Sequence, residues 1–226
     1  MKRFLVPAAI LLALAYPVLT MEFPVYQRLG ALVLLAAIGA SAWNIVGGYA
    51  GQVSVGHAVF FGFGAYSSVV VYTHLGWPPI TGAPLGMALS VGLASIIGVP
   101  TLRLSGHYFS MATIAVAELV RVLSSTSEFL GGAQGLGGPA IPRTVFDLSF
   151  LSAMPYYYIF LAVLAFILGL TWSIERGRMG FYLRAIKDSE RSARSLGVSA
   201  GRYKLYAYML SGAFASLAGS LYLCMF

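Results

Sequence analysis

Two charged side chains stand inside a long apolar stretch of the sequence. Glu118 and Arg121 lie three positions apart in the run Tyr108–Leu123, and this spacing puts both on one face of a helix. An ionisable group within a membrane-spanning helix is energetically expensive, so it commonly has a function or a partner of opposite charge. Two interpretations stay open: a structural ion pair, or a Glu118 carboxylate that takes part in solute passage or gating.

A second polar group follows a glycine-rich sequence. Gln52, Ser54 and His57 are spaced among glycines, directly before another apolar run. Glycine allows irregular backbone and close helix approach, so the segment is either small-residue packing or an unwound stretch whose three polar side chains line a substrate path. No second histidine lies at metal-ligand spacing and Cys224 is the one cysteine, so we expect no metal site.

A basic segment, Arg178–Lys204, carries a helical pattern. One face has Tyr182, Ile186, Ser189, Ala193 and Leu196, and a second stripe has Arg184, Lys187, Arg191 and Arg194. This pattern predicts one short amphipathic helix, with Glu190 and Arg194 as an i,i+4 pair. Gly197 is placed to end the helix and Ser199 to cap the next one. The helix either lies on anionic lipid or docks against a soluble partner.

The sequence shows no nucleotide-binding motif. The glycine-rich stretch Gly131–Pro139 is not followed by Gly-Lys-Ser/Thr and is therefore not a P-loop. The sequence also offers no convincing nucleophile–base pair. We therefore expect a protein that is not an enzyme and holds no cofactor of its own.

The elements that position these residues are membrane-spanning helices. The chain is 59% hydrophobic and 9% charged, whereas soluble domains are about 45–50% apolar and about 25% charged. A bilayer core needs roughly 17–25 apolar helical residues. Seven runs come near that length: Phe4–Leu19, Leu29–Val46, Val53–Tyr72, Leu85–Leu102, Tyr108–Leu123, Tyr156–Ile174 and Leu205–Phe226. The prediction is an all-α polytopic bundle, in which Val53–Tyr72 could be a broken or re-entrant helix.

The distribution of Lys and Arg predicts the orientation. With the N-terminus inside, 11 of the 14 basic residues fall on the cytoplasmic side and 3 on the other side, and 8 of the 11 lie in the segment 175–204. The net charge of +7 is thus a topology signal and does not indicate nucleic-acid binding. The start, Lys2-Arg3 followed by a short apolar run, also resembles a signal peptide, whose cleavage would leave this orientation unchanged.

Four blocks of residues resemble a known family. They are Asn44–Tyr66 with Gly-Gln-x-Ser-x-Gly-His, Arg103–Glu118 with Leu-Arg-Leu-x-Gly-x-Tyr-Phe, Gly131–Pro142, and Gly180–Tyr222 with Leu-Arg-Ala-Ile-x-x-x-Glu-x-x-Ala-Arg-x-Leu-Gly. Together they resemble the M-type branched-chain amino acid permease subunits of bacterial ABC importers, over roughly residues 30–226. Because the family usually continues with further spans, the resemblance implies that this single transmembrane domain, 1–226, is C-terminally incomplete.

The resemblance also implies partners and roles. A second permease subunit, two cytoplasmic ATP-binding subunits and a periplasmic solute-binding protein would act with this chain in the bacterial inner membrane. The segment 175–204 would couple to the ATPase, through Arg184, Ala185, Asp188, Glu190, Ala193, Leu196 and Gly197. The solute would be a branched-chain or other hydrophobic amino acid, or alternatively urea or a short amide. Apart from the resemblance, Glu118 and His57 near spans leave a second function open, an ion-gradient-driven secondary transporter.

Overall fold

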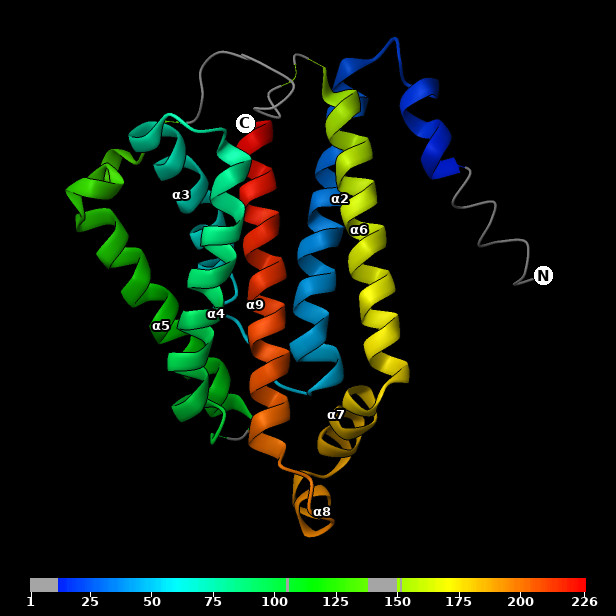
Figure 1. Ribbon diagram of the computed structural model, residues 1–226, viewed down its shortest axis with the longest axis vertical. Coiled ribbons are helices and arrows are strands. Elements are labelled where there is room, and N and C mark those ends of the chain that lie inside the picture. Colours follow the sequence, from blue (N-terminus) through cyan, green and yellow to red (C-terminus); the bar gives the residue numbers. More distant parts are fainter. Residues whose placement is uncertain (1–11, 105, 138–149, 151) are drawn as a thin grey trace.

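The computed structural model describes residues 12–104, 106–137, 150 and 152–226, and every regular element in them is helical. The longer helices, shown in Figure 1, are α2 (Pro24–Asn44), α3 (Ala58–Leu75), α4 (Gly82–Thr101), α5 (His107–Thr126), α6 (Ala153–Arg176), α7 (Arg178–Asp188), α8 (Glu190–Ser195) and α9 (Ala200–Met225). Shorter pieces are the π-helix η1 (Ile45–Tyr49) and the 3₁₀ turns η2 (Pro79–Thr81), η3 (Glu128–Leu130) and η4 (Gly132–Gln134).

Six helical stretches in the described residues are long and apolar enough to cross a membrane. They are Pro24–Tyr49, Ala58–Leu75, Pro79–Thr101, His107–Thr126, Ala153–Arg176 and Ala200–Met225. Each corresponds to one expected span, so the predicted polytopic helical bundle is confirmed. The expected first span, Phe4–Leu19, lies partly outside the described residues, and its part 12–19 is helical.

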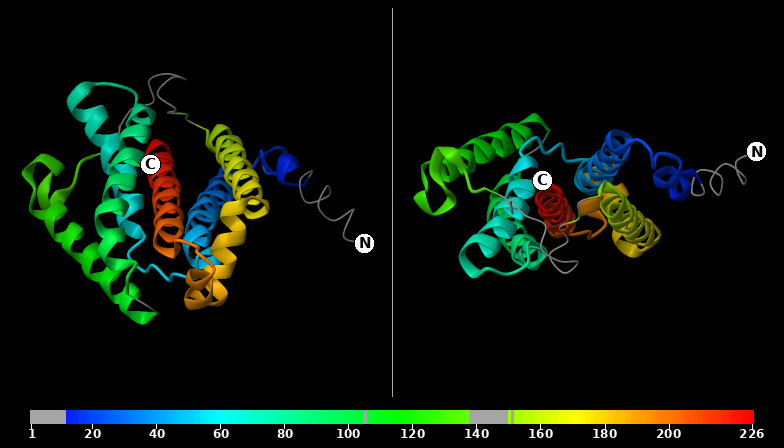
Figure 2. Two further views of the ribbon diagram at one scale, coloured as in Figure 1. Left: turned by 60° about the horizontal axis from the view of Figure 1, so that its bottom comes forward. Right: turned by 90° about the horizontal axis from the view of Figure 1, so that it is seen from above.

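Helix α9 forms the centre of the bundle. It contacts α3, α4 and α2, and the view from above shows it between the α3–α4 pair and the α2–α6 pair (Figure 2). Small residues allow this packing, because without a side chain two helix backbones can approach closely. A Cβ added at Gly64 would collide with the Ser216 carbonyl oxygen, and one at Gly219 with the Phe61 carbonyl oxygen. The α3–α9 interface is therefore a backbone-to-backbone contact.

Helix α5 is the least buried of the membrane-spanning helices. Only Phe109 and Thr113 of its residues are buried, and both lie in its first half. Its second half diverges from the neighbouring helices, as Figure 1 shows. A groove consequently opens between α5 and the α3–α4 pair.

The boundary expected at Val53 is wrong. Helix α3 begins at Ala58, and residues 50–57 form an irregular connection between η1 and α3. Gly51 has φ +67°, a left-handed conformation that interrupts the helix and that glycine adopts without a Cβ penalty. The interruption thus precedes α3 and does not break it.

The single amphipathic helix expected for Arg178–Lys204 is also wrong. The structure divides it into α7 and α8 at Ser189, whose extended backbone has φ −158°. The Ser189 side chain accepts a hydrogen bond from the Ser192 N–H and so caps α8. Gly197, with φ +84°, ends α8 as predicted, whereas Ser199 precedes α9 without a side-chain capping bond. A local capping bond thus outweighs the continuous helical spacing.

Candidate functional site

The irregular segment 50–57 runs from the α7 end of the bundle into its interior. At its start, the Gln52 N–H donates to the Val46 carbonyl at 3.0 Å, and Gly51 lies against Lys187 of α7. At its end, His57 meets Ser211, which lies near the middle of α9. Polar backbone at this depth is tolerated only where the protein supplies hydrogen-bond partners.

Side chains of two helices supply those partners. Trp43 Nε1 donates to the Ser54 carbonyl at 2.7 Å, and the Val55 N–H donates to Thr113 Oγ1 at 3.2 Å. Ser110 Oγ donates to the Val53 carbonyl at 2.6 Å. The segment is therefore held by α2 on one side and by the first half of α5 on the other.

His57 joins the segment to the central helix. Its Nε2 lies 2.8 Å from Ser211 Oγ and its Nδ1 lies 3.2 Å from Ser54 Oγ. Because the Ser211 hydroxyl donates to the Ala42 carbonyl at 2.5 Å, it accepts from His57 Nε2–H. These contacts tie together α2, segment 50–57 and α9.

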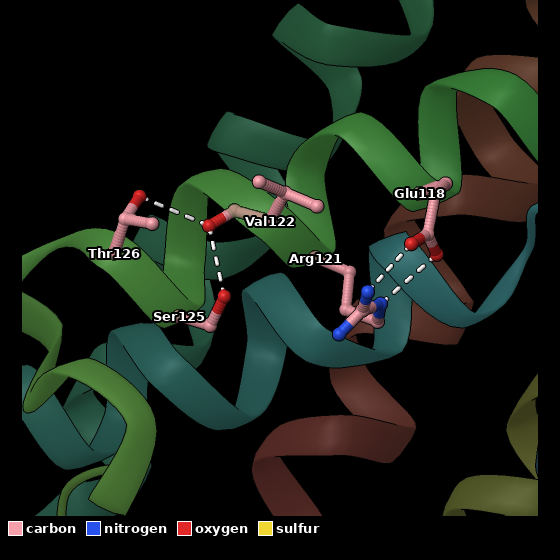
Figure 3. Close-up of polar contacts among 5 residues, drawn as sticks. All are labelled: Glu118, Arg121, Val122, Ser125 and Thr126. Atoms are coloured by element: carbon pink, nitrogen blue, oxygen red, sulfur yellow. Dashed lines mark hydrogen bonds and ion pairs between the residues drawn. The ribbon is translucent and has the colours of Figure 1, made fainter.

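The predicted path residues do not form one cluster. Ser54 and His57 are in contact, whereas no hydrogen bond joins the Gln52 side chain to either of them among the described contacts. Glu118 lies on α5 and pairs with Arg121: Oε1 is 2.5 Å from Arg121 Nη2 and Oε2 is 2.9 Å from Nε (Figure 3). The structure thus contains the ion pair that the spacing predicted.

This ion pair lies in the groove between α5 and the α3–α4 pair. The groove has a volume of about 950 Å³ and a largely apolar lining that includes Val55, Val59, Phe63, Leu85, Leu89 and Ile114. Tyr66, Ser124, Ser125 and Gln134 add polar groups. The groove begins beside segment 50–57, because Val55 of that segment is part of its wall.

Helix α7 is attached to η1 by polar contacts. Lys187 Nζ donates to the Gly48 carbonyl at 2.8 Å. The Glu175 carboxylate, at the end of α6, accepts from the Tyr49 hydroxyl at 3.2 Å and from Arg184 at 2.6 Å. A displacement of α7 would therefore act directly on the end of η1, next to segment 50–57.

Helix α8 is attached to α9 by a partly buried ion pair. The Glu190 carboxylate binds both the Lys204 ammonium and Arg194, the latter at 2.5 Å, and the Lys204 side chain is only 2% exposed. Burial acts to raise the pKa of Glu190, but the Lys204 and Arg194 charges together hold that pKa below its ordinary value. The paired carboxylate therefore stays ionised at neutral pH.

The predicted coupling residues divide into an anchored and an exposed set. Ala193 is buried in a small apolar cluster with Ile186 and Ala200. Arg184 and Glu190 make the ion pairs above, whereas Asp188, Leu196 and Gly197 are exposed and Ala185 is intermediate. Leu196 is 85% exposed at the tip of the segment, although the helical spacing placed it on the same face as Ile186.

Several residues that hold segment 50–57, α7 and α8 in place could not be identified from the sequence. Lys187 and Lys204 count there only as positive charges, Thr113 and Ser211 look like ordinary members of apolar runs, and Tyr49 is one residue of the glycine-rich segment. A lysine directly before the apolar run Leu205–Phe226 was the one available signal, because a charge beside a span needs a partner. In the described part of the chain, no three His, Cys, Asp or Glu side chains gather to hold a metal ion.

The fold is that of a multi-pass membrane protein, in which the irregular segment 50–57 enters the interior of the helical bundle. The profile of the family described as "Branched-chain amino acid transport system / permease component" matches residues 26–226. The chain therefore belongs to this permease family. The resemblance seen in the four sequence blocks is thereby confirmed.

Two curated relatives are similar over almost the whole chain. They are the high-affinity branched-chain amino acid transport system permease proteins LivM of Escherichia coli K12 and of Salmonella typhimurium LT2, each 28% identical over 246 aligned residues and 98% of this chain. The chain spans 57% of the length of each of these relatives. No solved structure gives a significant match.

Proposed function

We propose that this chain is a membrane-spanning permease subunit of an ATP-driven importer for branched-chain or other hydrophobic amino acids. In this proposal ATP is hydrolysed on two separate cytoplasmic ATP-binding subunits. A second permease subunit completes the path and a periplasmic solute-binding protein delivers the solute. The family membership and the similarity to the two LivM proteins support the solute class.

The observation that supports the proposal most directly is that α7 and α8 are fixed to the bundle while their tip is exposed. The two short helices are fixed to the bundle through Lys187 and Glu190, yet they present Leu196 to solvent at their tip. An exposed leucine on a segment held at two points can be buried in an apolar pocket of a partner subunit, which would contribute about 1.5–3 kcal/mol to binding. Attachment at two points would transmit the partner's movement to η1 and to α9.

Variants at the tip test this docking function. Leu196→Ser removes the apolar side chain, and because burying a leucine contributes about 1.5–3 kcal/mol, the ATP-binding subunits should bind roughly ten- to a hundredfold more weakly. Ser195→Ala is the matched control at the neighbouring exposed position. Co-purification after mild detergent extraction measures the binding, and equal retention of the subunits by both variants would contradict the docking function.

Ala193 is less suited to this test than its sequence position suggests. Because its side chain is buried against Ile186 and Ala200, a charged residue there would displace α8 from the bundle. Loss of coupling in such a variant would then report packing and not direct contact with a partner. A substitution at Leu196 changes the exposed surface alone.

We further propose that the α7–α8 end is cytoplasmic and that the membrane is the bacterial inner membrane. The excess of basic residues in the segment 175–204 supports this orientation. In a Cys224→Ser background, Ser195→Cys should react with a membrane-impermeant maleimide only in inside-out vesicles. Glu128→Cys, beyond the other end of α5, should react only in right-side-out vesicles, and the opposite pattern would overturn the orientation.

An ion-gradient-driven transporter is the competing function. It would use a carboxylate that binds and releases the coupling ion, and Glu118 is an acidic residue in the interior of a span. Because Glu118 is already paired with Arg121, we favour the ATP-driven importer. Uptake into proteoliposomes by a gradient alone, without ATP-binding subunits, would establish the competing function.

A further inference from the structure

We propose that the groove beside α5 binds the solute as a zwitterion, with Glu118 and Arg121 holding the two charges of a free amino acid and the apolar walls holding its side chain. This site rests on the proposed function, because it identifies where an amino-acid permease would hold its solute. The inference comes from the placement of the ion pair, the lining of the groove and its connection to segment 50–57.

The ion pair lies in the second half of α5, inside the membrane-spanning helix. Glu118 and Arg121 come 11 and 14 residues after His107, so they lie about 17 and 21 Å along an α5 of about 30 Å. Their side chains are 59% and 66% exposed, and both line the groove. A pair of charges facing hydrocarbon at this depth would be very unfavourable. The groove therefore needs polar contents next to these two side chains.

An amino acid matches the pair in charge. Its α-carboxylate suits the planar fork of Arg121, which binds carboxylates through two hydrogen bonds, and its α-ammonium suits the carboxylate of Glu118. The entering solute exchanges one Glu–Arg contact for two contacts of the same kind. Because the pair and the zwitterion are each neutral overall, no unbalanced charge is left in the groove.

The rest of the groove matches an aliphatic side chain. Its volume of about 950 Å³ lies within the roughly 300–1,000 Å³ of small-molecule sites, and its walls include Val59, Leu89 and Ile114. A second charge on the solute would enter this apolar region without a partner. The site consequently selects neutral, apolar amino acids over lysine or glutamate, and urea lacks both charges that the pair binds.

The groove is also connected to the irregular segment. Val55 forms part of its wall, and the Val55 N–H is bound by Thr113 of α5, on the same helix as the ion pair. A shift of segment 50–57 would thus move one wall of the groove. Lys187 contacts Gly48 of η1, directly before this segment, and Gly51 at its start, which connects the α7–α8 end to the wall of the site.

Photolabelling locates the site directly. The probe is a diazirine analogue of leucine that keeps both charges, applied to the purified chain in lipid nanodiscs without ATP or partner subunits. Labelled peptides should map to Ala58–Leu75 and His107–Thr126, the two helices that supply the ion pair and the facing wall. Leucine should compete with the probe. Three other compounds should compete at least about tenfold more weakly: lysine, urea, and 4-methylpentanoate, which is leucine without its ammonium group.

The key variant is the double substitution Glu118→Gln with Arg121→Gln. It removes both charges together, so neither remains unpaired and the helix keeps its length and polarity. Labelling of the two helices should fall at least about tenfold. The matched control is Glu128→Gln with Arg103→Gln, an acidic and a basic residue outside the groove lining, and it should label like the unaltered chain.

The outcomes separate this site from the proposed function. Unchanged labelling in the double variant, or equal competition by leucine and 4-methylpentanoate, overturns the zwitterion site. ATP-driven leucine uptake, measured with the partner subunits, tests the proposed function independently. Uptake that survives the double variant overturns the site and leaves the proposed function intact, whereas labelling as expected without any ATP-driven uptake supports the site and overturns the proposed function.

Discussion

The ion pair between Glu190 and Lys204 predicts an asymmetric response to mutation. Lys204 is almost completely buried, and within the described residues its ammonium pairs with Glu190 alone. Glu190 is 30% exposed and also pairs with Arg194. Removing the carboxylate therefore leaves a buried charge without a partner, whereas removing the ammonium leaves a carboxylate that keeps Arg194 and water.

The structure gives the size of each effect. Breaking a fully buried pair by removing one partner costs about 3–5 kcal/mol, and the partial exposure of Glu190 reduces this to about 2–3 kcal/mol for Glu190→Gln. Lys204→Met keeps the apolar stem and should cost about 1 kcal/mol or less. Both figures refer to the free energy of local unfolding of α8 from α9.

Hydrogen exchange of the α8 amides measures this local unfolding. Since 1.4 kcal/mol is a factor of ten, Glu190→Gln should accelerate exchange about 30- to 140-fold and Lys204→Met about fivefold. Arg191→Gln, at an exposed position in the same helix, is the control and should change exchange little. Equal acceleration by the two variants, or a larger effect of Lys204→Met, would show that the buried Lys204 charge does not depend on Glu190 as its partner.

The same pair predicts a pH dependence with a defined sign. Because the folded pKa of Glu190 lies below its ordinary value of about 4.5, the pair stabilises α8 fully above that value. The stabilisation is lost as the pH falls through the lowered pKa. Protection of α8, corrected for intrinsic exchange, should be constant from pH 7 to about 5 and then decline. The decline should be smaller in Lys204→Met, because that variant loses a charge that lowers the folded pKa of Glu190.

Three further predictions concern the bundle and its connections. Gly64→Ala forces two backbones apart and should destabilise the protein by about 1–3 kcal/mol in detergent unfolding, whereas Gly92→Ala, with open space around its Cβ, should be neutral or slightly stabilising; equal effects would contradict the α3–α9 contact. Lys187→Met removes the bond to the Gly48 carbonyl and should raise amide exchange in residues 45–52 about fivefold, an effect that should be absent if the contact does not hold η1. His57→Leu leaves two serine hydroxyls with one partner fewer and should destabilise by about 1–3 kcal/mol, whereas a change below about 0.5 kcal/mol would argue against the hydrogen-bond chain.

The membrane-spanning helices could be predicted because their signal is strong and local. Long apolar runs must be helical in lipid, and six of the seven expected runs lie on the six spans found in the described residues. The boundary before α3 could not be predicted in the same way. Val53 and Val55 continue the apolar pattern, but Gly51 and the bonds from Trp43 and Ser110 hold them in irregular backbone.

The ion pairs likewise could be predicted only where both residues lie close together in the sequence. The Glu118–Arg121 pair could be predicted from a spacing of three residues on one helix. The Glu190–Lys204 pair spans 14 residues and depends on the turn at Gly197, so no local pattern reveals it. Spacing alone also predicted one continuous helix through Ser189, because it contains no information about a serine side chain that caps the helix after it.

The break at Ser189 has a mechanical consequence. Helix α8 and the start of α9 form two sides of a closed triangle that meet at Gly197, and the salt bridge from Glu190 to Lys204 is its third side; α7 joins this triangle at Ser189. Three elements joined at three points keep their relative positions when one of them is pushed, whereas a single helix on a flexible loop would turn about the loop. A force applied at Leu196 would thus rotate α8 and the start of α9 together as one rigid unit.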